Sequence, residues 1–182
     1  GKRAVSNFTG LGNYSRFIIG ALNKKFQNET YKVFAPKPKN NREFSELLGE
    51  NTSDYYPKSR IAKLVPSLWR SKLILKDIKR ENIDIFHGLS GELPFGISKS
   101  GIKSVVTIHD LIFRHYPQYY KAIDRAIYDY KFRRACKEAD KIIAVSDCTK
   151  RDIISFYNIP EEKIVTIYQG CHPNFKAVPN QE

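Results

Sequence analysis

The stretch Lys103-Ser-Val-Val-Thr-Ile-His109-Asp110-Leu-Ile-Phe113 combines a run of β-prone residues with an ionisable pair directly behind it. The apolar run is almost continuous, which is typical of a parallel strand covered on both faces. In open α/β sheets, ligands bind beyond the carboxyl ends of the strands. We therefore expect His109 and Asp110 to lie at the edge of a site. The alternative is a structural histidine that forms a hydrogen bond with a neighbouring loop.

Shorter apolar runs and stretches of helical spacing alternate on both sides of this strand. Strands are expected at residues 31–35, 83–87, 141–145 and 163–168, and helices at 14–25, 43–48, 66–80, 118–138 and 147–157. Ser146 is a good N-cap for the last of these helices, and the polar residues 51–58 are expected to be irregular. The alternation of strand and helix predicts an α/β fold with a mostly parallel sheet and helices on both faces.

Composition restricts the class of protein. The 182 residues suffice for one domain with a real core, and 41% hydrophobic residues exclude a disordered chain. No apolar run approaches the length of about 20 residues that a membrane span needs, and residues 1–6 lack the apolar core of a signal peptide. We therefore expect a soluble, cytoplasmic protein. Three cysteines without CxxC spacing (Cys136, Cys148 and Cys171) indicate reduced, mostly buried side chains rather than disulfides or a zinc site.

The net charge of +12 is concentrated in one segment. Residues 57–80 contain eight basic residues and one acid, Asp77, and most of them fall on the helix expected at 66–80, with Trp69 turned toward the sheet. The segment is interpreted as a solvated helix face, as a surface for anionic lipid headgroups, or as a surface for nucleic acid. No RNA-binding signature or zinc-finger spacing supports the last interpretation, so we expect no nucleic-acid partner.

Glycines and histidines mark two further candidate sites. Thr9-Gly10-Leu-Gly12-Asn13-Tyr14 opens the first helix, where free backbone N–H groups favour an anion, although glycines in such a turn also simply allow the chain to bend. His87 ends the strand at 83–87 and precedes a second glycine-containing loop with Glu92. His87, His109, Asp110 and His115 lie on separate loops without metal-ligand spacing, so no metal site is expected.

Four patches in order resemble the N-terminal domain of family 4 retaining glycosyltransferases, which have the GT-B fold of two Rossmann-like domains. They are the glycine stretch at 9–14, the strand end Thr107-Ile-His109-Asp110, the segment Ile143-Ala-Val-Ser146-Asp-Cys-Thr-Lys-Arg-Asp152-Ile153, and the exit Val165-Thr-Ile-Tyr168-Gln-Gly170-Cys-His-Pro-Asn-Phe175. The resemblance implies an N-terminal domain at residues 1–175, a linker that begins at 176–182, and a C-terminal donor domain beyond it.

The resemblance also implies a function and a set of site residues. A mannose- or glucose-type sugar would move from a nucleotide-sugar donor to a saccharide or lipid-linked acceptor with retention of configuration. No metal or cofactor is required. Gly10, Gly12 and Asn13 would face the donor diphosphate, and His109 with Asp110 would lie at the reacting centre. His87, Glu92 and Arg114 are expected on the acceptor side. Rival interpretations are a non-catalytic anion- or partner-binding module and a peripheral membrane domain that docks through the Trp69 helix and Tyr116, Tyr119 and Tyr120.

The first strand of the family's sheet has no counterpart in the sequence. Only Lys2-Arg-Ala-Val-Ser precedes the glycine stretch, whereas the resemblance places a central apolar strand there. Unpaired backbone groups in the middle of a sheet cost about 1–3 kcal/mol each, so something has to fill the gap. Candidates are upstream sequence, a short strand at residues 2–7, and a strand from a neighbouring molecule. We expect partial filling by residues 2–5.

Overall fold

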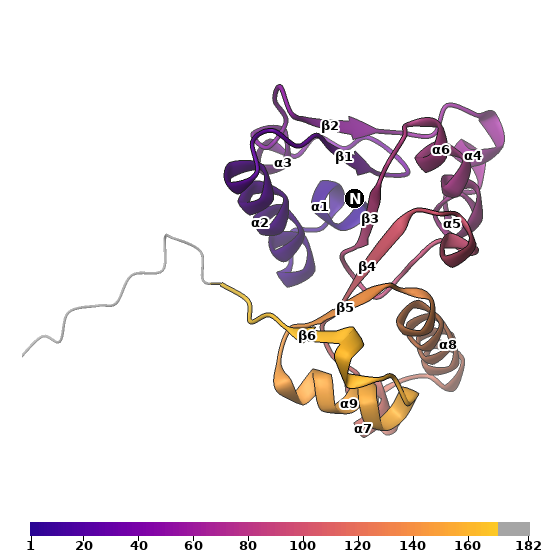
Figure 1. Cartoon of the computed structure of the whole chain (residues 1–182). Helices are drawn as coiled ribbons and strands as arrows, with labels where there is room; N and C mark the ends of the chain where they lie inside the picture. Colours follow the sequence, from indigo (N-terminus) through magenta and orange to yellow (C-terminus); the bar gives the residue numbers. More distant parts are fainter. Residues whose placement is uncertain (171–182) are drawn as a thin grey trace, which may run out of the picture.

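The computed structural model describes residues 1–170, apart from the side chain of Ile61, and confirms an α/β fold with parallel strands flanked by helices (Figure 1). The six strands form two sheets, β1-β2 and β3-β4-β5-β6, in which every neighbouring pair is parallel. Their bounds are β1 Tyr31–Phe34, β2 Thr52–Tyr55, β3 Ile85–Gly88, β4 Lys103–Ile108, β5 Lys141–Ala144 and β6 Ile164–Thr166.

Helices connect successive strands. The α-helices are α1 Lys2–Ser6, α2 Gly10–Lys25, α3 Arg42–Ser45, α4 Arg60–Leu64, α5 Pro66–Leu68, α6 Ile74–Arg80, α7 Ile112–His115, α8 Ala122–Glu138 and α9 Asp147–Tyr157. A π-helical segment, Trp69–Leu73, joins α5 to α6, and 3₁₀ turns lie at Ile97–Lys99, Pro117–Tyr119 and Glu161–Lys163. None of the helices within residues 1–170 is long and apolar enough to span a bilayer.

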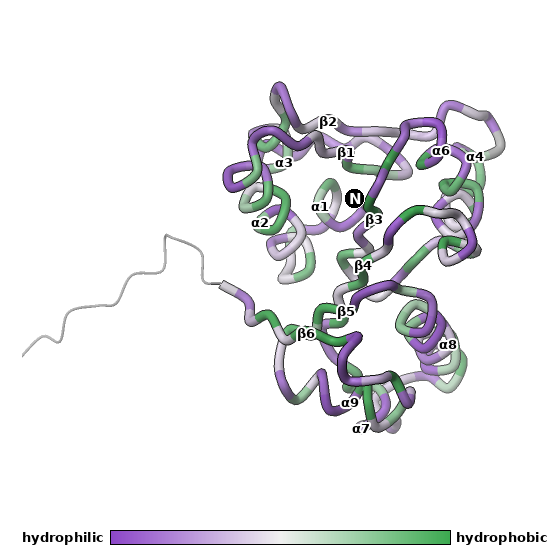
Figure 2. Tube along the Cα trace, in the orientation of Figure 1, coloured by the Kyte–Doolittle hydropathy of each residue, from purple (hydrophilic) through white to green (hydrophobic). Residues whose placement is uncertain are grey.

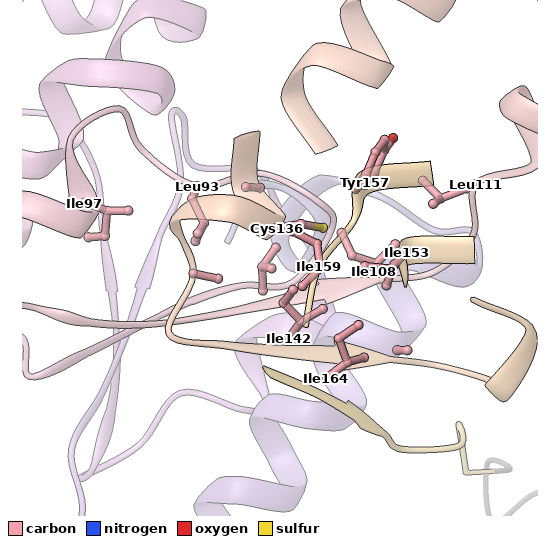
Figure 3. Close-up of a cluster of buried hydrophobic side chains, with 14 of the residues drawn as sticks. Leu93, Ile97, Ile108, Leu111, Cys136, Ile142, Ile153, Tyr157, Ile159 and Ile164 are labelled. Atoms are coloured by element: carbon pink, nitrogen blue, oxygen red, sulfur yellow. The ribbon is translucent and has the colours of Figure 1, made fainter. Parts of the chain in front are cut away.

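The two central strands of the larger sheet, β4 and β5, bury most of their apolar side chains, and Figure 2 shows hydrophobic residues along both strands. Val106 and Ile108 of β4 pack beside Ile142 of β5 in one buried cluster, which Figure 3 shows together with side chains from α8 and α9. The register pairs Val106 with Ile142 and Ile108 with Ala144. This arrangement confirms the buried parallel strand that the sequence predicts at residues 103–108.

The smaller sheet belongs to the N-terminal part of the fold, and here two predictions are wrong. Residues 2–5 are not a partial strand: they lie in helix α1, whose Ala4 and Val5 are fully buried beside Val33 and Ala35. The Val5 amide donates to the Gly1 carbonyl at 3.1 Å within this helix, and Arg16 and Asn41 donate to the carbonyls of Ala4 and Val5, so the segment needs no neighbouring strand. Among the described residues, β1 therefore pairs only with β2, and β3 only with β4.

Residues 51–58 are the second wrong prediction, because they contain strand β2. Its polar sequence, Thr-Ser-Asp-Tyr, gives no apolar signal, and the parallel ladder to β1 is formed by backbone groups. A third buried cluster, which includes Phe34 of β1, Tyr55 of β2 and Trp69, packs the smaller sheet against the helices that precede β3. Trp69 is fully buried there, which excludes it as a direct lipid contact.

Smaller differences concern the helix bounds and the cysteines. Residues 112–115 form the short helix α7, for which no helix is predicted, and the first helix begins at Gly10 instead of Tyr14. Cys136 is buried as expected, whereas Cys148 is exposed. Cys171, the end of the exit motif at 171–175 and the linker predicted at 176–182 lie outside the described residues.

Candidate functional site

The carboxyl ends of β3 and β4 bring polar side chains together around the hydroxyl of Thr107. His87 Nε2 lies 2.9 Å from Thr107 Oγ1, and the Tyr14 hydroxyl of α2 lies 3.3 Å from the same oxygen. Thr107 itself is completely buried. Burial of the His87 ring lowers its pKa to about 4, so His87 is neutral near pH 7. These three groups form a neutral hydrogen-bonded cluster where an α/β sheet binds its ligand.

His109 lies beside this cluster and has a defined tautomer. Its Nε2 is 3.0 Å from the Leu89 carbonyl oxygen, which only accepts, so Nε2 carries the proton. Burial lowers the pKa of His109, and the neutral ring therefore leaves a lone pair on Nδ1. The Gln169 side-chain amide lies 3.1 Å from Nδ1 and donates to it. Nδ1 is thus a hydrogen-bond acceptor whose partner among residues 1–170 is the exposed side chain of Gln169, which an incoming hydroxyl group can replace.

Two neighbouring elements hold His109 in place. The Thr149 hydroxyl at the start of α9 donates to the His109 carbonyl at 3.0 Å, and Ser146 caps the same helix turn by accepting from the Thr149 amide at 3.1 Å. On the other side, the Tyr14 ring meets the imidazole edge-to-face, with the ring centroids 4.7 Å apart. The site is therefore built from β4, α2 and α9, and its geometry depends on how these elements pack.

The glycine stretch forms the first turn of α2 rather than a loop before it. The amides of Gly12 and Asn13 already donate to the Thr9 carbonyl, at 2.9 Å and 3.0 Å. Within the described chain, the amides of Gly10 and Leu11 have no acceptor. A Cβ at position 12 would lie 1.8 Å from the Asn7 carbonyl oxygen, so chain packing requires this glycine, whereas a Cβ at Gly10 would meet nothing within 4 Å. The open positive end of α2 therefore lies at Gly10.

The other predicted site residues are engaged in local contacts. The Asn13 side chain accepts from Arg16, and Asp110 Oδ1 accepts from the Ile112 amide at 3.2 Å, which starts α7. Glu92 pairs with Lys131 at 3.0 Å. Arg114 pairs with Asp129 at 3.4 Å and covers the Phe156 ring. The structure brings His87 and His109 together but does not bring Arg114 into their cluster.

Sequence reasoning missed Tyr14, Thr107, Thr149 and Gln169. Thr107 carries a signal that could have been used, since it is a polar residue inside an otherwise apolar strand directly before His109. In the sequence, Tyr14 is one of several residues that form the apolar face of the first helix, and nothing in the residues around Gln169 marks it as a site residue. In the part of the chain that the structure describes, no three His, Cys, Asp or Glu side chains are grouped closely enough to hold a metal ion.

Known proteins resemble the chain over most of its length. The model of Glycosyltransferase Family 4 matches residues 9–175. O-antigen chain mannosyltransferase B of Escherichia coli is 27% identical over 182 residues, covering 92% of this chain and 45% of that protein. A crystal structure of a glycosyltransferase from Rickettsia africae ESF-5 superimposes with a TM-score of 0.50 and 21% identity, covering 88% of this chain and 40% of that one.

These matches differ in what they support. The crystal structure, at this level of identity, supports the fold alone. The chain spans less than half the length of either protein that it resembles. The family model, in contrast, covers most of the chain, including the glycine stretch, both strand-end histidines and α9. The chain therefore belongs to glycosyltransferase family 4 and corresponds to the N-terminal domain of these enzymes.

Proposed function

We propose that the protein transfers a mannose- or glucose-type sugar from a nucleotide-sugar donor to a saccharide or lipid-linked acceptor, with retention of configuration. The observation that carries the proposal is the convergence of the open α2 terminus, Nδ1 of His109 and the His87–Thr107–Tyr14 cluster at one edge of the fold. Family membership supports glycosyl transfer in general. The relative in Escherichia coli, an O-antigen chain mannosyltransferase, supports mannose and a polysaccharide product.

The open end of α2 is suited to the donor diphosphate. Free amides at Gly10 and Leu11 and the positive end of the 16-residue helix point to one place, where they stabilise negative charge without reorganisation. In a retaining transfer, the leaving diphosphate gains charge as the sugar departs and helps to deprotonate the acceptor hydroxyl on the same face. The Asn13 side chain supports this turn by accepting a hydrogen bond from Arg16.

His109 is proposed to orient the sugar by accepting a hydrogen bond from one of its hydroxyls at Nδ1, in place of Gln169. The Leu89 carbonyl fixes the required tautomer, and Thr149 and Tyr14 fix the ring. Asp110 positions the loop behind His109 by capping α7. On the acceptor side we propose His87 and Glu92. No metal or cofactor is required in this scheme, because backbone amides and the neutral imidazole supply the polar contacts.

The central test uses the full-length protein and mannose and glucose donors carrying different nucleotides. We expect one donor to give a product in which the anomeric configuration of the donor is retained, as measured by NMR.

His109→Ala should lower kcat about 10- to 1000-fold while leaving the protein folded, as expected for one positioned hydrogen-bonding group. His115→Ala is the matched control, since His115 pairs with Asp152 on the exposed side of α7. A fall in melting temperature with unchanged kcat would make His109 a structural residue only.

A second variant tests the donor end of the site. Gly10→Val fills open space in front of α2 without a clash, so it should raise KM for the donor while the melting temperature stays close to that of the wild type.

Residues 1–182 alone are expected to transfer no sugar, because the resemblance places the nucleotide pocket in the second domain. A non-catalytic binding module would instead bind nucleotide-sugars without turnover in the full-length protein.

A further inference from the structure

The segment that leaves β6 crosses the candidate site. Residues 167–170, which we call the strap, run from the end of β6 toward α2 (Figure 1). The Ile167 amide donates to the Ala144 carbonyl at 2.9 Å, which extends the ladder between β5 and β6 by one residue. At the other end, a Cβ on Gly170 would lie 3.0 Å from the Phe17 ring, so the backbone of Gly170 packs on α2. The strap therefore bridges the larger sheet and α2.

Tyr168 of the strap is tied to the first turn of α9. Its hydroxyl donates to Asp147 Oδ2 at 2.6 Å, and hydrogen bonds to a carboxylate are about twice as strong as bonds between neutral groups. This contact lowers the pKa of Asp147 and raises that of Tyr168, so near pH 7 the carboxylate is charged and the hydroxyl keeps its proton. Because Tyr168 is 67% exposed, apolar burial contributes little, and the hydrogen bond is the contact that fixes the side chain.

Gln169 follows directly and reaches His109. Its side-chain amide donates to His109 Nδ1 at 3.1 Å. The backbone of His109 is fixed by the same turn of α9, since Thr149, two positions after Asp147, donates its hydroxyl to the His109 carbonyl at 3.0 Å. One helix turn thus holds both sides of the contact. Asp147 holds the strap, Thr149 holds the histidine, and the spacing between them sets the distance from Gln169 to Nδ1.

We propose that Tyr168 and Asp147 are positioning residues that hold Gln169 on His109 Nδ1, so that the strap competes with the sugar hydroxyl for this nitrogen. The competition rests on the proposed function of His109, whereas the positioning does not. A hydrogen bond between neutral groups changes an equilibrium about two- to tenfold, so substrate displaces the strap at a modest loss of apparent affinity. Release of Tyr168 from Asp147 frees Nδ1 without moving His109 itself.

The position of the strap is tested by NMR on the full-length protein with ¹⁵N-labelled histidine. The signals of His109 are assigned by their absence in His109→Gln. Gln169→Glu puts a carboxylate, which only accepts, beside Nδ1 and favours the doubly protonated ring. The pKa of His109 should therefore rise by about one pH unit. The other charged neighbours of the ring, Asp110 on the same loop and Arg3 of α1, are unchanged, and Tyr14 of α2 adds an uncharged ring.

The tie to α9 is tested by adding Tyr168→Phe to Gln169→Glu. Phenylalanine keeps the ring and loses the hydroxyl, so the strap is no longer fixed to Asp147. The carboxylate then spends less time beside Nδ1, and the rise in the pKa of His109 should be clearly smaller than in Gln169→Glu alone. Tyr119→Phe, at a tyrosine that is 79% exposed on the turn after α7, is the matched control. It should leave the rise unchanged.

Steady-state kinetics of the full-length protein test the competition. Gln169→Ala removes the competing donor and should lower KM for the nucleotide-sugar about two- to tenfold, with kcat nearly unchanged. Tyr168→Phe should lower KM in the same direction by less, and Tyr119→Phe should give wild-type values. A merely structural role of these exposed residues would change the melting temperature and leave KM as it is.

Three results would overturn the proposal. An unchanged pKa of His109 in Gln169→Glu would mean that the strap does not lie on His109. A pKa rise that Tyr168→Phe does not reduce would mean that Asp147 does not position the strap. An unchanged or higher KM in Gln169→Ala would mean that Gln169 does not compete with the sugar. Absence of turnover in the wild type would instead contradict the proposed function, and the NMR titrations would still decide where the strap lies.

Discussion

The two sheets differ in the interactions that stabilise them, although both are parallel and both are covered by helices. The larger sheet, β3 to β6, encloses one continuous apolar cluster that includes Val106, Ile108 and Ile142. The smaller sheet, β1 and β2, packs on two smaller apolar clusters, and buried polar side chains, among them Arg16 and Asn41, also tie its helices together. Arg16 donates to the carbonyls of Ala4 and Asn7, and Asn41 donates to that of Val5. Apolar burial, which has no directional requirement, dominates in the first region, whereas the second combines apolar burial with specific hydrogen bonds.

This difference explains where the candidate site lies. The histidines end the strands β3 and β4 of the apolar sheet, so their backbone positions are fixed by close packing. Tyr14 and the open end of α2 come from the polar region. A change in the hydrogen bonds that link α1, α2 and Asn41 is therefore expected to shift α2, and with it the Tyr14 ring that packs on His109.

The largest effect is expected from a cavity in the apolar sheet. Ile142→Ala removes a fully buried side chain in the middle of β5 and should lower the free energy of unfolding by about 2–5 kcal/mol, measured by urea denaturation. Val165→Ala on β6, where the side chain is 48% exposed, is the control and should change it by less than about 0.5 kcal/mol. Similar decreases in the free energy of unfolding for both variants would mean that buried apolar side chains are not what stabilises the larger sheet.

The next effect is expected from the buried arginine of the polar region. Arg16→Met removes the guanidinium hydrogen bonds to the carbonyls of Ala4 and Asn7 and the pair with Glu43, at a cost of about 2–3 kcal/mol. Arg42→Met breaks an exposed pair with Glu46 and should cost no more than about 0.5 kcal/mol. Hydrogen exchange should show that Arg16→Met loosens α1 to α3 before the larger sheet. Uniform loosening would contradict the division between the two regions.

A third effect of similar size is expected from pH, at the boundary between the regions. Burial lowers the pKa of His87 from 6.5 to about 4, so the unfolded chain binds a proton at a higher pH than the folded chain. Stability from this group is present above pH 6.5 and is lost as the pH falls toward 4, by about 2 kcal/mol between pH 7 and pH 5. His87→Gln should remove this part of the pH dependence in thermal unfolding.

The smallest effect is expected from the helix caps, and it should differ between the regions. Ser146→Ala removes the cap of α9 and should cost about 1 kcal/mol. Asn41→Ala removes the cap of α3 together with a hydrogen bond to α1, so about 1–2 kcal/mol is expected. The two losses are measured side by side in urea. A larger loss in Ser146→Ala than in Asn41→Ala would contradict the stronger dependence of the polar region on hydrogen bonds.

The amino-acid sequence by itself determined the larger sheet, its helices and the strand-end positions of His87 and His109. Apolar runs such as residues 103–108 specify a buried strand locally, and a serine before a helix specifies its cap, so no distant contact has to be known. For the same reason, four short motifs in order were enough to identify the family that the comparisons then confirmed.

Only the tertiary structure decided strand β2 of the smaller sheet, helix α1 and the inner contacts of the site. Thr52–Tyr55 becomes a strand because the backbone of β1 offers a ladder, and residues 2–6 become a helix because Arg16 and Asn41 satisfy its carbonyls. Tyr14 and Thr107 meet across 93 positions of sequence, and the α8 stripe stays exposed where its spacing suggests a buried face. These outcomes depend on which partner a polar or apolar group finds in space, and that information is absent from local spacing.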